Sequence, residues 1–123
     1  MLKPIETIKI LLNSSNIKSL TAGEIIFQQG TEGKVMYGII EGEVEMLVDD
    51  KVVETIQQGD VFGQGALLHS DHLRTSTARA KTDCKIAVLD QEHFLFAVQE
   101  TPLFALEVMR SYSDRFRRLK LLI

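Results

Sequence analysis

Short apolar runs separated by glycines dominate the middle of the chain. The run GEVEMLV alternates apolar and polar residues, which is typical of a strand with one buried face. DDK at positions 49–51 follows it and precedes another valine-rich run, which predicts a β-hairpin with a tight turn. The predicted strands cover 24–28, 35–41, 42–48, 52–57, 75–80 and 85–89. Many short strands at even spacing predict a closed β architecture, a jelly roll or a barrel.

Helical patterns replace this alternation at both ends. PIETIKILLNSS predicts an N-terminal helix within residues 1–14, and residues 91–123 predict C-terminal helices. We expect Thr101 to be the N-cap of the last helix and Pro102 its first helical residue. The predicted fold class is therefore mainly β: a β jelly roll (double-stranded β-helix) over 18–90, flanked by an N-terminal helix and C-terminal helices. The length fits a single domain, 1–123.

The last helix carries an apolar stripe at heptad spacing. Its members are Ala105, Met109, Tyr112, Phe116, Leu119 and Ile123. Steps of alternately four and three residues keep such a stripe on one face of a helix. Two interpretations stay open: the stripe packs on the β core, or it is the seam of a homodimer.

Composition excludes several functional classes. The net charge of −3 argues against non-specific nucleic-acid binding, and no apolar run approaches the ~20 residues of a membrane span. The single Cys84 rules out an internal disulfide and fits a reducing compartment, so we expect a cytoplasmic protein in which Cys84 is a buried small apolar residue. The first residues are amphipathic and do not read as a signal peptide.

The candidate chemistry lies in GDVFGQGALLHSDHLRTSTARA, residues 59–80. Three glycines allow sharp turns that uncover backbone N–H groups, and Gly65–Leu68 predicts one helical turn whose N–H groups favour an anion. Arg74 follows with three hydroxyl residues, and a guanidinium can bind a phosphate through two hydrogen bonds. One arginine with these donors fits a single phosphate. The alternative is a surface arginine paired with Asp71 or Glu100.

Other chemistry finds little support in the sequence. His69 and His72 have a spacing that a metal accepts, but no third ligand is near in sequence, so no metal is expected. No nucleophile or carboxylate pair has a base beside it, so we do not expect an enzyme.

At this point the sequence resembles a known family. GEIIFQQGTEGKVMYGIIEGEVEML, followed by GDVFGQGALL and RTSTA, is similar to the cyclic-nucleotide-binding domains of catabolite-activator-type regulators, protein kinase regulatory subunits and nucleotide-gated channels. The resemblance covers about residues 15–120 and implies a phosphate-binding cassette at 63–77. The ligand-binding residues that it implies are Phe62, Gly63, Gln64, Gly65, Ala66, Leu67, Arg74, Thr75, Ser76 and Thr77.

The resemblance also implies individual roles. Gly63 would allow close approach of the ligand, Ala66 would donate its N–H to the cyclic phosphate, and Arg74 would pair with that phosphate. Thr75 would add a donor. Gln64 stands where many members have a glutamate that accepts a hydrogen bond from the ribose 2′-hydroxyl, and a neutral amide would accept it more weakly.

The implied function is a stand-alone regulatory domain that binds cAMP or cGMP and signals through movement of its C-terminal helix to an effector protein. Tyr112, Arg115 and Phe116 are the candidates for covering the base. The alternative is a degenerate domain that kept the fold as a protein-interaction or dimerisation module without nucleotide. We do not expect DNA binding by this chain, because no helix-turn-helix segment follows the domain in this sequence.

Overall fold

The computed structural model describes Pro4, Ile8 and residues 16–123. The predicted helix of residues 1–14 lies outside the described residues, apart from Pro4 and Ile8. Both of these side chains are buried.

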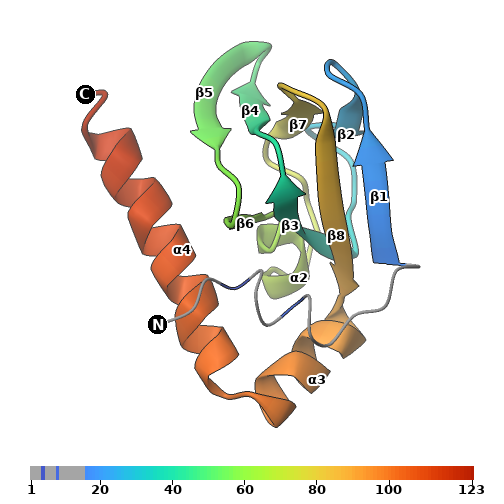
Figure 1. Cartoon of the computed structure of the whole chain (residues 1–123). Helices are drawn as coiled ribbons and strands as arrows, with labels where there is room; N and C mark the ends of the chain where they lie inside the picture. The colour runs from blue at the N-terminus through green and yellow to red at the C-terminus, as the bar shows by residue number, and fades with distance from the viewer. Residues whose placement is uncertain (1–3, 5–7, 9–15) are drawn as a thin grey trace.

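Two four-stranded antiparallel sheets face each other (Figure 1). The first sheet has the order β1 (Ile17–Leu20), β8 (Cys84–Asp90), β3 (Val35–Glu41) and β6 (Val61–Phe62). The second has the order β2 (Ile25–Phe27), β7 (Thr77–Ala80), β4 (Val44–Val48) and β5 (Lys51–Ile56). The predicted fold class, a mainly β jelly roll with C-terminal helices, is confirmed.

The strand boundaries correct the sequence prediction at three places. β1 and β6 were not predicted, because four and two residues are too few to show alternation. β7 begins at Thr77 and not at Thr75, so Thr75 and Ser76 belong to an irregular segment before the strand. Because Thr75 and Ser76 lie outside the strand, their backbone is not held by strand pairing and can line a cavity.

The β4–β5 hairpin confirms the predicted tight turn. Val48 pairs with Lys51 across a two-residue loop, and both loop residues have positive φ, 51° at Asp49 and 66° at Asp50. Positive φ at both central residues characterises a type I′ turn, whose twist matches that of the flanking strands. Aspartate tolerates this conformation.

The core has two parts because the first sheet is buried on both faces. Successive residues of a strand point to opposite faces, so Tyr37 enters the cluster between the sheets while Met36 enters the cluster under the helices. Cys84 is buried in the cluster between the sheets, as expected.

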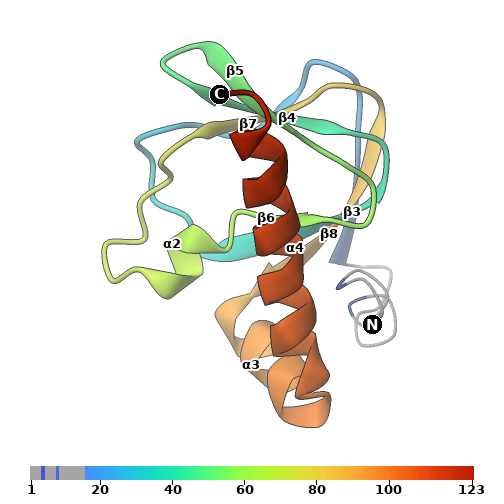
Figure 2. The same ribbon diagram turned by 90° about the vertical axis from the view of Figure 1, so that its left-hand side faces the viewer.

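Two helices follow the sheets, α3 (Gln91–Glu100) and α4 (Leu103–Lys120). Asp90 caps α3 by accepting a hydrogen bond from the His93 N–H at 2.8 Å. The prediction that Thr101 is the N-cap of α4 is wrong, because α4 begins at Leu103. The Phe104 N–H donates a hydrogen bond to the backbone carbonyl of Thr101 and not to the Thr101 hydroxyl. α4 then runs along one side of the jelly roll (Figures 1 and 2). None of the described helices combines the length and apolar character that crossing a bilayer requires.

α4 meets the sheets with a different face from the one that the heptad stripe suggested. Its buried residues are Phe104, Glu107, Val108, Ser111 and Arg115. The large members of the stripe are exposed, Met109 by 65% and Phe116 by 59%. The interpretation that the stripe packs on the β core is therefore wrong.

Candidate functional site

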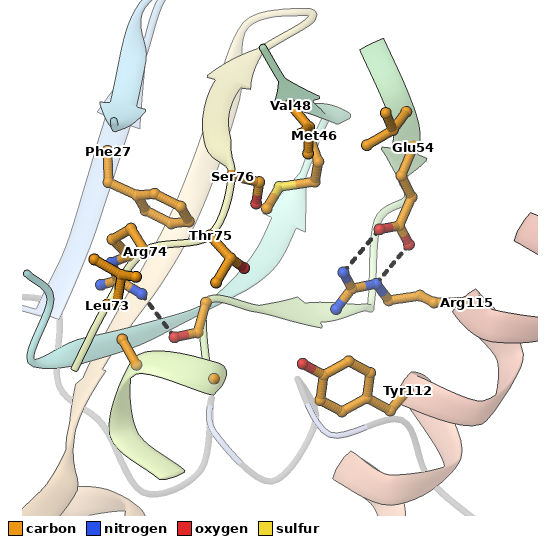
Figure 3. Close-up of a pocket in the computed structure, with 14 residues that line it drawn as sticks. Phe27, Met46, Val48, Glu54, Leu73, Arg74, Thr75, Ser76, Tyr112 and Arg115 are labelled. Carbon is orange, nitrogen blue, oxygen red and sulfur yellow. Dashed lines mark hydrogen bonds and ion pairs between the residues drawn. The ribbon is translucent and has the colours of Figure 1, made fainter. Parts of the chain in front are cut away.

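A cavity of about 250 Å³ lies between the glycine loop, the segment before β7, the β4–β5 hairpin and α4 (Figure 3). Its lining residues are Phe27, Met46, Val48, Val53, Glu54, Gly63, Gly65, Ala66, Leu73, Arg74, Thr75, Ser76, Tyr112 and Arg115. Elements far apart in the sequence thus share one small site. Its volume lies just below the range of ~300 to 1,000 Å³ that is usual for ligand pockets, so it suits one small ligand.

Six of the ten predicted site residues line this cavity: Gly63, Gly65, Ala66, Arg74, Thr75 and Ser76. The structure does not bring the other four to it. Phe62 is buried between the sheets, and Leu67 belongs to the core under the helices. The Thr77 hydroxyl accepts a hydrogen bond from the Gln29 N–H at 2.9 Å.

The fourth of these residues, Gln64, departs most from its expected role. Its side chain is only 1% exposed, and neither its amide oxygen nor its amide nitrogen has a hydrogen-bond partner among the described residues. It precedes α2 (Gly65–Leu68) in helical conformation. The amide expected at the ribose therefore lies buried away from the cavity lining.

Gly63 lets the chain pass close to Arg74. Its φ is +79°, a conformation that side-chain-bearing residues rarely adopt. A Cβ at this position would lie 3.0 Å from the Arg74 Nη1 and 3.2 Å from the Tyr37 ring. Both the backbone conformation and the space favour glycine here.

Arg74 is buried, only 4% exposed, and is held by backbone oxygens. Its Nη1 donates to the Gly63 carbonyl at 2.7 Å, and its Nη2 donates to the Val35 carbonyl at 2.6 Å. Its Cζ lies 4.1 Å from the centroid of the Phe27 ring. Burial lowers the pKa of Arg74, and Tyr37 beside it acts in the opposite direction.

The charge of Arg74 has no counter-ion among the described residues. Neither alternative acid pairs with it, and the Asp71 carboxylate instead accepts a hydrogen bond from the Leu73 N–H at 3.0 Å. A guanidinium stays protonated even when buried, and an unpaired buried charge is costly. The cavity therefore has an unneutralised cation at one end, which favours an anion.

The other end of the cavity combines apolar side chains with an ion pair. Arg115 of α4 donates to Glu54 of β5 through Nε at 2.7 Å and Nη2 at 2.9 Å, with both side chains 9% exposed. Tyr112, one turn earlier, points its hydroxyl toward the glycine loop (Figure 3). Of the three candidates for covering a base, Tyr112 and Arg115 reach the cavity, and Phe116 does not.

Several lining residues were not singled out in the sequence. Met46, Val48 and Val53 belong to predicted strands rich in apolar residues, where they look like ordinary core residues. Glu54 is a polar residue within an apolar strand, which is a weak signal. Its partner is 61 residues away, and only the folded chain shows the pair.

No group of three or more His, Cys, Asp or Glu residues in the described part of the chain could hold a metal ion. His72 has a structural contact instead: its Nδ1 lies 2.8 Å from the Ala66 carbonyl.

Comparison with known proteins gives a consistent result. The family model described as cyclic nucleotide-binding domain matches residues 17–101. A cAMP-dependent protein kinase regulatory subunit of Eremothecium gossypii is 36% identical over 85 residues, which is 69% of this chain and 18% of that protein. The cAMP-activated global transcriptional regulator CRP of Salmonella typhimurium is 27% identical over 119 residues, which is 93% of this chain and 55% of that protein. The chain thus spans between 18% and 55% of the length of these relatives.

A solved structure of cAMP-bound PfPKA-R has the same fold. Its TM-score is 0.71 at 27% sequence identity, over 98% of this chain and 44% of that chain. The residues matched by the family model include every residue that lines the cavity except Tyr112 and Arg115 of α4.

Proposed function

This chain belongs to the cyclic nucleotide-binding domain family, and from that premise we propose that it binds one cyclic nucleotide, cAMP or cGMP, in the cavity beside α2. A single observation carries the proposal: Arg74 brings one buried positive charge to the cavity, and no described carboxylate neutralises it. A cyclic phosphate carries one negative charge and would supply the missing counter-ion. The proposed role is binding without a metal and without catalysis.

The lining residues suggest how the nucleotide lies. We expect the cyclic phosphate beside Arg74, with the Ala66 N–H and the hydroxyl groups of Thr75 and Ser76 as further donors. The purine would then extend between the apolar hairpin residues and α4. The Tyr112 ring would cover the purine, because two aromatic rings stack favourably on each other.

We also propose that α4 transmits occupancy to an effector protein. α4 supplies Tyr112 and Arg115 to the cavity, so a ligand that contacts them would bind one placement of the helix better than another. Only such a difference in affinity can shift a conformational population. The exposed stripe of α4 is the surface that a second copy or an effector would contact.

The test is calorimetric titration of the purified chain with cAMP and with cGMP, which also decides between the two ligands. Replacing Arg74 by alanine should weaken binding by about 2 kcal/mol or more, because a desolvated charge pair loses one partner. Arg79→Ala is the matched control, since Arg79 lies on β7, pairs with Glu45 at 3.2 Å and does not line the cavity. Equal losses in the two variants would remove Arg74 from the site.

A second candidate is an interaction module that has lost its ligand. The observation in its favour is the buried amide of Gln64, which leaves no side chain of this residue at the cavity. The same titration separates the candidates, since a pure interaction module would take up neither nucleotide.

A further inference from the structure

A short backbone pairing fixes Gly33 against Arg74. The Arg74 N–H donates to the Thr31 carbonyl at 2.8 Å, and the Gly30 N–H donates to the Arg74 carbonyl at 2.7 Å. The Gly33 N–H donates to the His72 carbonyl at 2.8 Å. These bonds set the register between the turn before β3 and the segment that carries Arg74.

The backbone of Gly33 does not itself require glycine. Gly30 and Gly63 have positive φ, at 86° and 79°, but Gly33 does not. The φ of Gly33 therefore gives no reason for glycine at this position. The space around Gly33 does give one.

That space is filled by the guanidinium of Arg74. A Cβ at position 33 would overlap Nε, Cζ and Nη2 of this side chain. The guanidinium cannot withdraw freely, because the carbonyls of Val35 and Gly63 hold it and the Phe27 ring lies over it. A single methyl group at position 33 would displace the cation without removing its charge.

We propose that Gly33 is a positioning residue for the phosphate anchor: its missing side chain leaves a slot in which two carbonyls and the Phe27 ring hold the Arg74 guanidinium at the cavity. The part that concerns the ligand rests on the proposed cyclic-nucleotide binding, whereas the slot itself does not. In the described residues no acidic side chain orients this arginine, so the backbone does so.

The first arm of the test is a double-mutant cycle in ligand affinity with Gly33→Ala and Arg74→Ala, measured with cAMP and cGMP. We expect Gly33→Ala to weaken binding by about tenfold or more, although Arg74 is still present. Adding Gly33→Ala to Arg74→Ala should cause no further loss, because Gly33 acts only through that side chain. Unchanged or tighter binding by Gly33→Ala, or losses that multiply in the double variant, would overturn the proposal.

The second arm needs no ligand and uses thermal melting of the same four proteins. Gly33→Ala should lower Tm when Arg74 is present and change it little when Arg74 is alanine, since the overlapping atoms are then gone. Gly30→Ala is the control: a Cβ there meets nothing within 4 Å, but φ is +86°, so its cost should be the same in both backgrounds. If Gly33→Ala does not fold, a folded double variant still supports the slot, and an unfolded one contradicts it.

The two arms separate the two proposals. A wild-type chain that binds neither nucleotide would refute the proposed function. Thermal melting of the four proteins would still decide whether Gly33 makes room for Arg74. Additive losses of Tm in the Gly33 cycle would reject the slot even if the chain binds a nucleotide.

Discussion

Among single residues, Gln64 combines full burial with an amide that finds no hydrogen-bond partner in the described part of the chain. An unsatisfied buried polar group costs about 1–3 kcal/mol, and an apolar side chain of the same shape avoids that cost. Gln64→Met should therefore raise the free energy of unfolding of the ligand-free domain by about 1 kcal/mol. Urea unfolding measures this directly.

The same variant tests whether Gln64 turns to the ribose when ligand binds. In that case Gln64→Met should weaken binding of cAMP or cGMP and leave binding of the 2′-deoxy analogue unchanged, since the analogue has no hydroxyl to donate. A variant that is less stable than the parent would show that the amide has a structural partner.

The sequence predicted a turn at Gly63 and an anion site at Arg74. The turn is observed, with φ of +79° at Gly63, and both residues line the cavity, whereas anion binding by Arg74 stays a prediction. The direction of the Gln64 side chain depends on packing around α2, and the anchoring of Arg74 depends on carbonyls 11 and 39 residues away. The residues that neighbour Gln64 and Arg74 in the sequence indicate neither this packing nor these carbonyl contacts.

At the scale of elements, the docking of α4 depends on the ion pair between Arg115 and Glu54. Both side chains are nearly buried, and the Arg115 Nη1 also donates to the Val61 carbonyl at 3.1 Å. Removing one partner of a buried pair costs about 3–5 kcal/mol, because the other charge is left without compensation. Glu54→Gln should therefore destabilise the domain by about 3 kcal/mol and speed hydrogen exchange in α4.

Glu45→Gln is the matched control for this change. Glu45 pairs with Arg79, but that pair is more exposed, and exposed pairs contribute only about 0–1 kcal/mol. Equal destabilisation by the two variants, or unchanged hydrogen exchange in α4 of Glu54→Gln, would contradict the role of the ion pair in docking.

The elements themselves were predictable as far as periodicity reaches. Alternation located β4, valine- and isoleucine-rich runs located β3 and β5, and helical spacing located α3 and α4. The turn between β4 and β5 was also predicted correctly. β6 has two residues and is a strand only because Val61 and Phe62 pair with β3. The start of α4 was misjudged because capping depends on geometry as well as on residue type.

For the whole molecule, the exposed face of α4 raises the question of assembly. Met109, Tyr112 and Phe116 are all exposed, and their heptad spacing matches a helix that packs on a second helix. Heptad spacing was visible in the sequence, but it does not say which face of the helix meets the jelly roll. In the structure, the face of α4 that packs against the jelly roll contains Ser111 and Arg115. The stripe lies on another face and is available for contact with a second copy of the chain.

Phe116→Asp tests this assembly. If the stripe is a dimer seam, a carboxylate at its centre should lose its hydration on association, and the dimer should dissociate at concentrations where the parent is dimeric. The folded monomer should stay intact, because changes of exposed residues usually alter stability by less than about 0.5 kcal/mol. Nucleotide affinity should also persist, since Phe116 does not line the cavity.

Light scattering measures the mass of the Phe116→Asp variant and of its parent. Leu95→Asp on the exposed face of α3 is the control, because it introduces the same charge outside the stripe. A parent that is monomeric at high concentration, or a Phe116→Asp variant that stays dimeric, would assign the stripe to a different partner.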